Sequence, residues 1–255
     1  MTGAVAAAGS IVVGPPGAPA IVFVHGTRLT GSFWAAQQAA LGGEFRTIAP
    51  DLPAHGARAS ESFTLDGAAD AVAAAIRAES PDGRAIVVGL SLGGYVAMAL
   101  AAREPDLVGG LVVSGASAEP VGPLTLPFGV FATIMDGVAD ERLDRLNAWF
   151  FRRRYPPAIA EPIVAGGFWS HGGAEAVRCL VGQRFIPRLA AYPGPSLIVN
   201  GEFDVVFRPG ARAFAAAARD ARRVRLGGAS HLANLDRPAA FSEAVRRFAR
   251  SVASR

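Results

Sequence analysis

The sequence predicts an α/β fold built on a mostly parallel sheet with helices on both faces. Short apolar runs of strand length alternate with longer stretches that are rich in alanine. The runs are apolar at successive positions, which is typical of strands buried on both faces. Parallel strands need long crossovers, which are usually helical, so the alternation indicates a doubly wound sheet.

The first half of the chain contains most of this pattern. Strands are expected at Ile21–Val24, Phe45–Ala49, Ala85–Leu90 and Leu107–Ser114. Helices are expected at Phe33–Leu41, Leu65–Ala78 and Gly93–Ala102. Pro50 closes the second strand, because proline has no N–H to donate to a neighbouring strand.

The alternation resumes near the C-terminus. Strands are expected at Ser196–Asn200 and Val224–Leu226, and helices at Arg212–Ala218 and from about Pro238 to Val252. Proline is tolerated in the first turn of a helix, which supports a start near position 238. We therefore expect residues 1–118 and 189–255 to form one core.

Residues 119–188 break the alternation. They hold nine of the chain's 21 aromatic residues. We predict that this stretch is a helical lid inserted into the core, and that its inner face lines an apolar pocket. The candidate lining residues are Trp149, Phe150, Phe151, Phe168 and Trp169.

The composition excludes several kinds of chemistry. The chain has no lysine, so Schiff-base and P-loop lysines are impossible. Because the chain has only one cysteine, Cys179, it can form neither an intrachain disulfide nor a CxxC metal site. The pI is about 10.1, but the arginines are dispersed and no nucleic-acid-binding motif accompanies them. We expect no nucleic-acid partner.

Membrane insertion and secretion are not predicted either. No apolar run approaches the ~18 residues that span a bilayer. The segment Met1–Ser10 has neither the basic region nor the long apolar stretch of a signal peptide. We expect a cytoplasmic protein with no membrane partner.

A glycine-rich turn holds the candidate nucleophile. Residues 89–93 read Gly-Leu-Ser-Leu-Gly, between a predicted strand and a predicted helix. A sharp strand-to-helix turn crowds the positions two before and two after its centre, so glycine suits both. Such a turn lifts the Ser91 hydroxyl above the sheet at a helix N-terminus, where the Leu92 N–H can stabilise negative charge.

A serine needs a base, and the base needs a carboxylate that orients it. His231 follows the last predicted strand, which places it at the same edge of the sheet as Ser91. Asp204 follows the strand before, at that same edge. The alternative acids are Glu202, Asp106 and Asp236. The other histidines are His25 and His55, which we expect to brace loops, and His171, which we expect at a surface or pocket position.

These motifs resemble those of the α/β-hydrolase fold superfamily. Besides the turn at 89–93, the chain has His25-Gly26-Thr27 after a strand, the segment 51–56 (Asp-Leu-Pro-Ala-His-Gly), the segment 201–204 (Gly-Glu-Phe-Asp) and Ser230-His231. The order Ser91, Asp204, His231 is also that of the superfamily. The resemblance covers about Ile21–Val252, with the 119–188 segment unmatched.

The resemblance is to small serine esterases and lactonases that have a lid and need no cofactor or metal. It implies that Thr27 and Leu92 form the oxyanion hole. Relatives that use an aspartate nucleophile, such as epoxide hydrolases and haloalkane dehalogenases, are excluded by Ser91. Two departures are a short leading hairpin and Arg28, where many relatives have a small or apolar residue. Arg28 would either contact a substrate carboxylate or enolate, or point outward.

The predicted function is hydrolysis of a carboxylic ester or lactone that carries an apolar acyl or aryl group. A small molecule is the expected partner, and the reaction would pass through an acyl-enzyme on Ser91. Three alternatives remain open on the same fold: a C–C bond hydrolase of ring-cleavage diketones, a cofactor-free perhydrolase or acyltransferase, and a ligand sensor without turnover. The sequence predicts no oligomeric state.

Overall fold

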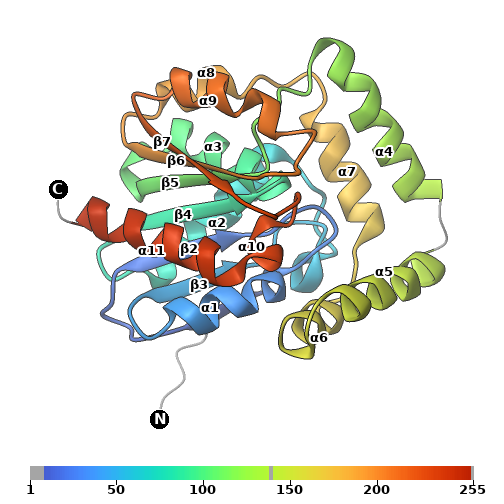
Figure 1. The fold of residues 1–255 in the computed structure, drawn as a ribbon, viewed down its shortest axis with the longest axis horizontal. Helices are drawn as coiled ribbons and strands as arrows, with labels where there is room; N and C mark the ends of the chain where they lie inside the picture. Colours follow the sequence, from blue (N-terminus) through green and yellow to red (C-terminus); the bar gives the residue numbers. More distant parts are fainter. Residues whose placement is uncertain (1–8, 138–139, 254–255) are drawn as a thin grey trace.

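A computed structural model describes residues 9–137 and 140–253, and its centre is a seven-stranded sheet (Figure 1). The strands are β1 (Ser10–Val13), β2 (Ala20–Val24), β3 (Arg46–Pro50), β4 (Ala85–Leu90), β5 (Val108–Ser114), β6 (Pro195–Gly201) and β7 (Asp220–Leu226). Their order is β1-β3-β2-β4-β5-β6-β7. Only β1 is antiparallel to its neighbour in this sheet. The predicted mostly parallel α/β fold is confirmed, and β1 is a strand that we did not predict.

Strands β2 to β6 send side chains into two cores. In β2, Val22 and Val24 join the core under helices α2 (Leu65–Glu79), α3 (Leu92–Arg103), α8 (Ile186–Ala191) and α9 (Ala211–Ala217). Ile21 and Phe23 join the core under α1 (Ala35–Leu41) and α11 (Pro238–Ala253). All five residues of β2 are buried. This burial on both faces explains why the strands read as continuous apolar runs.

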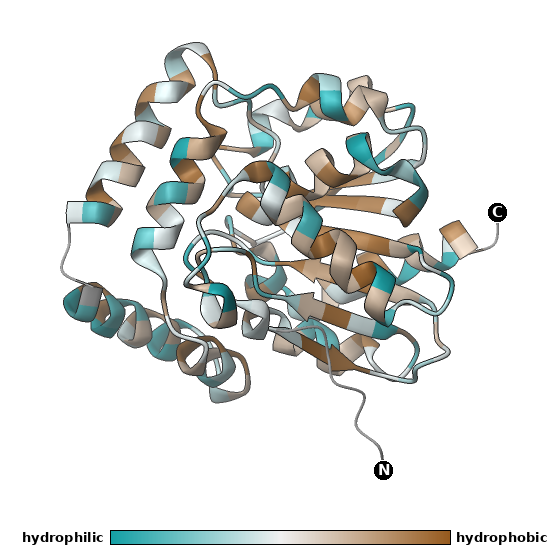
Figure 2. Ribbon diagram, turned by 180° about the vertical axis from the view of Figure 1, so that it is seen from behind, coloured by the Kyte–Doolittle hydropathy of each residue, from teal (hydrophilic) through white to brown (hydrophobic). Residues whose placement is uncertain are grey.

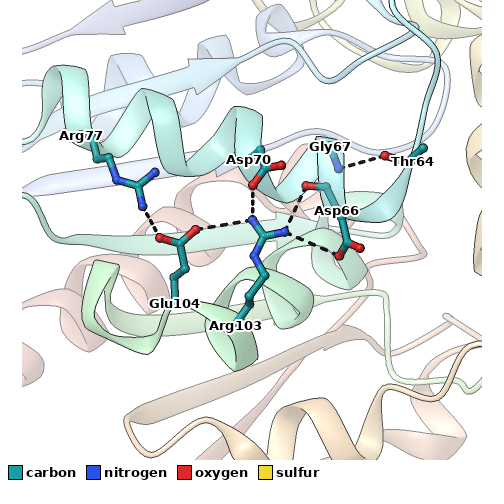
Figure 3. Close-up of polar contacts among 7 residues, drawn as sticks. All are labelled: Thr64, Asp66, Gly67, Asp70, Arg77, Arg103 and Glu104. Carbon is teal, nitrogen blue, oxygen red and sulfur yellow. Dashed lines mark hydrogen bonds and ion pairs between the residues drawn. The ribbon is translucent and has the colours of Figure 1, made fainter.

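Polar contacts join the solvent sides of α2 and α3 (Figure 3). The Thr64 hydroxyl caps α2 by accepting a hydrogen bond from the Gly67 N–H at 2.9 Å. Arg103, in the last turn of α3, pairs with Asp66 at 3.6 Å and also with Asp70. Helix α2 therefore has an apolar face on the sheet and a charged face toward water, whereas α3 is buried except near its C-terminal end, where Arg103 reaches α2.

The chain between β5 and β6 is helical, as expected from its lack of strand signals. It forms α4 (Thr125–Gly137), α5 (Asp140–Arg154), α6 (Pro157–Ala165), α7 (Ser170–Leu180) and α8, after the short 3₁₀ helix η4 (Gly122–Leu124). Figure 1 shows α4, α5 and α7 to one side of the sheet. Residue 188, where we predict the insertion to end, lies inside α8, which packs on α3 and α9.

No single helix among the described residues has both the length and the apolar composition to cross a membrane. The stretches Gly122–Gly137 and Glu141–Arg154 reach that threshold only as a pair, and they are bent by 112° relative to each other.

Candidate active site

The turn at residues 89–93 has the strained geometry that its glycines predict. Ser91 lies at φ 53° and ψ −119°, a conformation that L-residues rarely adopt. A Cβ at Gly89 would lie 2.2 Å from the Gly93 carbonyl oxygen, and one at Gly93 would lie 2.1 Å from the Val24 carbonyl oxygen. The backbone therefore leaves no room for side chains on either side of Ser91, and the serine is held between β4 and α3.

His231 and Asp204 form a hydrogen-bonded pair at the carboxyl ends of β6 and β7. The His231 Nδ1 atom lies 3.1 Å from Asp204 Oδ2. The other carboxylate oxygen of Asp204 accepts a hydrogen bond from the Phe207 N–H at 3.1 Å. The Phe207 ring stacks on the imidazole, with ring centroids 4.9 Å apart. Asp204 is buried and the imidazole is about one-third exposed, so the carboxylate is fixed and orients the ring.

Gly115 makes space for this pair, and the sequence reasoning did not single it out. It directly follows β5 and has φ 56°. A Cβ here would lie 2.9 Å from His231 Cε1 and 3.4 Å from Asp204 Oδ2. The available signal was a glycine immediately after a buried strand, at the same sheet edge as the other site residues.

Ser91 and His231 line one cavity of about 630 Å³, together with Asp204, Thr27 and Leu92. Within the described part of the chain, the Ser91 hydroxyl and the imidazole are not joined by a hydrogen bond. Such bonds between nucleophile and base are often long without substrate and shorten in the reacting complex. The cavity thus brings together the five residues that we predict for catalysis.

The alternative acids have other partners. Glu202 accepts a hydrogen bond from the Gly228 N–H at 2.9 Å. Asp106 lies in η3 (Pro105–Leu107), just before β5 and therefore at the opposite end of the sheet. Among the described residues, neither carboxylate forms a hydrogen bond or ion pair with the imidazole, so the geometry favours Asp204 over both of them as the orienting acid.

Asp236 fixes the loop that carries His231 through hydrogen bonds with Ser230. Its Oδ2 accepts hydrogen bonds from the Ser230 N–H at 2.7 Å and the Ser230 hydroxyl at 2.5 Å. Its Oδ1 accepts from Arg154 Nη2 at 2.7 Å and from the Tyr155 hydroxyl at 3.0 Å. Burial alone would raise the pKa of this carboxyl, but the hydrogen bonds from Ser230, Tyr155 and Arg154 outweigh burial and lower it. Asp236 thus links the residue before His231 to the end of α5.

His25 and His55 brace the loop that carries Thr27, as predicted. His25 Nε2 accepts a hydrogen bond from the Leu52 N–H at 3.0 Å, and His55 Nε2 accepts one from the Arg28 N–H at 3.2 Å. Burial lowers the pKa of His25 to about 4 and that of His55 to about 3. Both rings are therefore neutral at pH 7, as acceptors must be, and they hold the loop rather than act as bases.

The N–H groups of Thr27 and Leu92 are available to a ligand. No described residue accepts a hydrogen bond from either group, and Leu92 is the first residue of α3. The Thr27 hydroxyl donates to the Gly173 carbonyl at 3.2 Å, which ties this loop to α7. Two unpaired N–H groups beside one serine can stabilise an oxyanion.

Arg28 lines the cavity and does not simply point outward. Its backbone is left-handed, at φ 67°. Its Nε donates to the Ser170 hydroxyl at 3.1 Å, and its carbonyl accepts from the Trp169 N–H at 2.9 Å. The guanidinium therefore lies between the Thr27 loop and the start of α7, at the wall of the cavity.

The predicted aromatic lining requires a correction. Phe150, Phe151 and Phe168 line the cavity, whereas Trp149 and Trp169 lie outside it. Trp149 is on the solvent side of α5, with 63% of its surface exposed. The Trp169 indole donates to the Gly166 carbonyl at 3.1 Å. Aromatic content alone does not show which face of a helix points inward. The sequence therefore could not distinguish these two tryptophans from the aromatic residues that line the cavity.

Other lining residues come from segments that we did not single out. Leu124, Phe128 and Phe131 come from η4 and α4. Phe203, Val205 and Val206 come from the loop after β6. The cavity is therefore lined mainly by apolar side chains.

Comparisons with known proteins agree with this geometry. The sequence pattern of the family described as "Alpha/beta hydrolase family" matches residues 21–244. A pimeloyl-[acyl-carrier protein] methyl ester esterase of Chromobacterium violaceum is 30% identical over 89% of this chain and 92% of its own length. The enol-lactonase of Burkholderia xenovorans LB400 is similar in structure, with a TM-score of 0.76 and 26% identity over 94% of this chain and 93% of the enol-lactonase chain.

Some curated relatives match only in part. An "AB hydrolase superfamily protein" of Gibberella zeae is 38% identical over 102 residues, which are 39% of this chain and 36% of the relative. This chain thus spans little more than a third of that relative's length.

Proposed function

The chain belongs to the alpha/beta hydrolase family, and from that premise we propose that it is a serine hydrolase that cleaves a carboxylic ester or lactone. Its similarity to proteins named esterase and enol-lactonase supports hydrolysis of ester bonds in general. The observation that carries the proposal is the His231–Asp204 pair, which faces the cavity that also holds Ser91 at its strained turn.

In the proposed mechanism, Ser91 attacks the carbonyl carbon and His231 takes its proton. The N–H groups of Thr27 and Leu92 stabilise the resulting oxyanion, a contribution of roughly 10²–10³ in rate for each donor. His231 then protonates the leaving alcohol, and the acyl group stays on Ser91. Water activated by His231 releases the acid and restores the serine, while Asp204 holds the ring in the required tautomer.

We further propose that residues 119–188 form a lid over this site and that 1–118 and 189–255 form the core. Helices α4 and α5 supply apolar side chains to the cavity wall, including Phe131 and Phe150. A cavity of about 630 Å³ with an apolar wall suits an ester whose acyl or aryl part is apolar and of small to medium size.

A second candidate reaction is cleavage of a carbon–carbon bond in a diketone that carries a carboxylate. The observation that favours it is Arg28, which lines the same cavity. A guanidinium binds a carboxylate with two parallel hydrogen bonds. If Arg28→Gln selectively raises KM for esters with a distal carboxylate, the guanidinium binds substrate, and diketone substrates become the next to test.

A fluorophosphonate probe tests the nucleophile. We expect a single adduct on Ser91, found by mass spectrometry, and hydrolysis of p-nitrophenyl esters that is lost in Ser91→Ala. The exposed Ser60 provides a control, since Ser60→Ala should keep both properties. No adduct, or an adduct at another residue, would contradict the proposal.

A matched pair of variants tests the acid. We expect Asp204→Asn to lower kcat by about 10⁴ with the fold intact, because the imidazole loses its tautomer. Glu202→Gln should leave kcat nearly unchanged, since Glu202 holds the loop after β7. The reverse result would move the acid to Glu202.

A further inference from the structure

Exposed apolar side chains are concentrated in three segments that also contribute residues to the cavity wall. Among the described residues, 14 large apolar side chains are exposed, and 11 of them lie in three segments. Five lie on η4 and α4 (124–134), three on α5 (146–150) and three in the loop after β6 (203–206). We call these 11 residues the apolar rim. A surface patch of this kind normally marks a binding site for a protein or a membrane.

Helix α4 contributes an outward stripe to the rim. Leu126, Val130 and Ile134 follow one another at intervals of four residues and are 71%, 49% and 52% exposed. The opposite side of α4 packs on α7 through Ala132 and Met135. A helix at a water-exposed surface normally carries polar residues on its outer face, but Thr125–Met135 contains no charged residue. Figure 2 shows hydrophobic segments recurring along α4 at the edge of the molecule.

Helix α5 adds positive charge beside its rim residues. Arg142, Leu146, Trp149 and Arg153 are exposed and spaced so that they share one face of the helix. Neither Arg142 nor Arg153 forms an ion pair with another described residue. Arg208, also exposed, lies just after the rim residues of the β6 loop. Tryptophan and leucine flanked by arginine are typical of helices that lie in an anionic lipid interface.

We propose that the apolar rim and its flanking arginines dock this protein on an anionic lipid surface. The contact would be peripheral, with the rim in the interface and the arginines at the headgroups. From the sequence we expected no membrane partner, but that expectation concerned spanning segments, and a peripheral contact needs none. The inference adds a partner to the proposed function and does not depend on the reaction.

The charges favour a lipid surface over a second copy of the chain. In a two-fold dimer built on this patch, the same surface faces itself. The arginines of α5 would then be brought toward their own copies, and like charges at an interface are unfavourable. Anionic headgroups complement the same arginines.

The rim also opens directly into the cavity. Six of its members line the cavity wall: Leu124, Phe131, Phe150, Phe203, Val205 and Val206. An apolar ester dissolved in the lipid could therefore pass to Ser91 without crossing water. Packing within the protein does not explain why these six residues are exposed, whereas a path for substrate from the lipid to the cavity does.

Sedimentation with lipid vesicles tests the proposal without any catalytic readout. The full chain would be mixed with vesicles of phosphatidylglycerol and phosphatidylcholine, or of phosphatidylcholine alone. We expect binding to the anionic vesicles that weakens with salt. The double variant Val130→Glu and Ile134→Glu should lower binding at least about tenfold, because it places charge in the apolar stripe. Neither position lines the cavity, so hydrolysis of a water-soluble ester should be unchanged.

Two matched controls separate the rim from general effects. The variant Ile11→Glu with Val13→Glu makes the same changes at exposed positions of β1, away from the rim, and should bind vesicles like the wild type. Arg142→Gln with Arg153→Gln should lower binding about 25-fold, at roughly fivefold for each arginine. Arg222→Gln with Arg223→Gln removes two exposed arginines from β7 and should have a smaller effect.

Three outcomes would overturn the proposal. The first is that wild-type protein does not sediment with anionic vesicles. The second is equal loss of binding in the rim and β1 variants. The third is a dimer in light scattering that Val130→Glu with Ile134→Glu converts to a monomer, which would assign the rim to a second copy. If the double variant fails to fold, Leu126→Glu alone provides the same test at the most exposed position of the stripe.

Discussion

Helices α3 and α4 are alike in composition but opposite in environment. They have 12 and 13 residues, and each contains a single charged residue, Arg103 or Asp136. Ten residues of α3 are buried, whereas α4 buries only Ala132 and Met135. Helix α3 packs on β4, β5, α2 and α8, whereas α4 packs mainly on α7. Apolar composition therefore indicates that a helix face needs a partner, but not whether the same chain supplies it.

The largest expected difference between the two helices comes from one substitution made in both. A Cβ at Gly93 of α3 would lie 2.1 Å from the Val24 carbonyl oxygen, which is backbone and cannot move aside cheaply. We expect Gly93→Ala to lower the free energy of unfolding by about 3 kcal/mol or more. A Cβ at Gly129 of α4 meets no atom within 4 Å. Gly129→Ala should stabilise the protein by up to about 1 kcal/mol, because alanine is the better helix former.

Urea unfolding followed by circular dichroism measures both effects. A Gly93→Ala protein as stable as the wild type would show that β2 and the turn before α3 are not rigidly packed. A destabilising Gly129→Ala would show that α4 is more tightly packed than its exposure indicates.

The same contrast explains how much of the fold was predictable. Strands β2 to β6 and helices α2, α3 and α11 were predicted to within a few residues, because their burial is visible in the local pattern of apolar residues. The short strand β1 was missed, since its four residues bury only alternate positions at the edge of the sheet. The sequence also does not show which face of α5 points inward. Trp149 was therefore expected to line the cavity, but it lies outside it.

Some residues of the candidate site were predictable from the sequence and others were not. Ser91, Asp204 and His231 were predicted because each follows a recognisable strand, and the ends of parallel strands meet at one edge. Gly115 was given no role and Asp236 was considered only as an alternative acid, because their contacts involve residues far along the chain. Asp236, for example, contacts the Tyr155 hydroxyl across 81 positions. Long-range partners of this kind leave no local pattern.

A smaller effect concerns the two buried histidines, His25 and His55. Folding keeps His25 and His55 neutral, with pKa values of about 4 and 3 against 6.5 when unfolded. Below pH 6.5 the unfolded chain therefore binds more protons than the folded protein. Stability is fully present above pH 6.5 and falls as the pH drops toward 4, by up to about 1.4 kcal/mol per pH unit for each ring.

Urea titrations between pH 7.5 and 4.5 measure this slope. We expect His55→Gln to reduce the slope by about one proton, at the cost of some stability at pH 7 from the altered contact with Arg28. Identical slopes in wild type and His55→Gln would mean that protonation of His55 is not linked to folding.

The smallest expected effect concerns two exposed arginines, one in α3 and one in α5, the helix that follows α4. Arg103 of α3 pairs with Asp66 and Asp70 of α2 and with Glu104 (Figure 3), whereas the ion pair of Arg145 in α5 is with Glu141, at 3.8 Å. Exposed ion pairs contribute ~0.2–1 kcal/mol each, and networks contribute more than isolated pairs. We expect Arg103→Gln to lower the free energy of unfolding by about 1 kcal/mol at low salt and Arg145→Gln to leave it within ~0.3 kcal/mol. In 1 M NaCl, where the Debye length is ~3 Å, the two variants should become nearly equal. A difference that persists at high salt would instead come from packing of the Arg103 side chain on α2, and would make the contact between α2 and α3 mainly apolar.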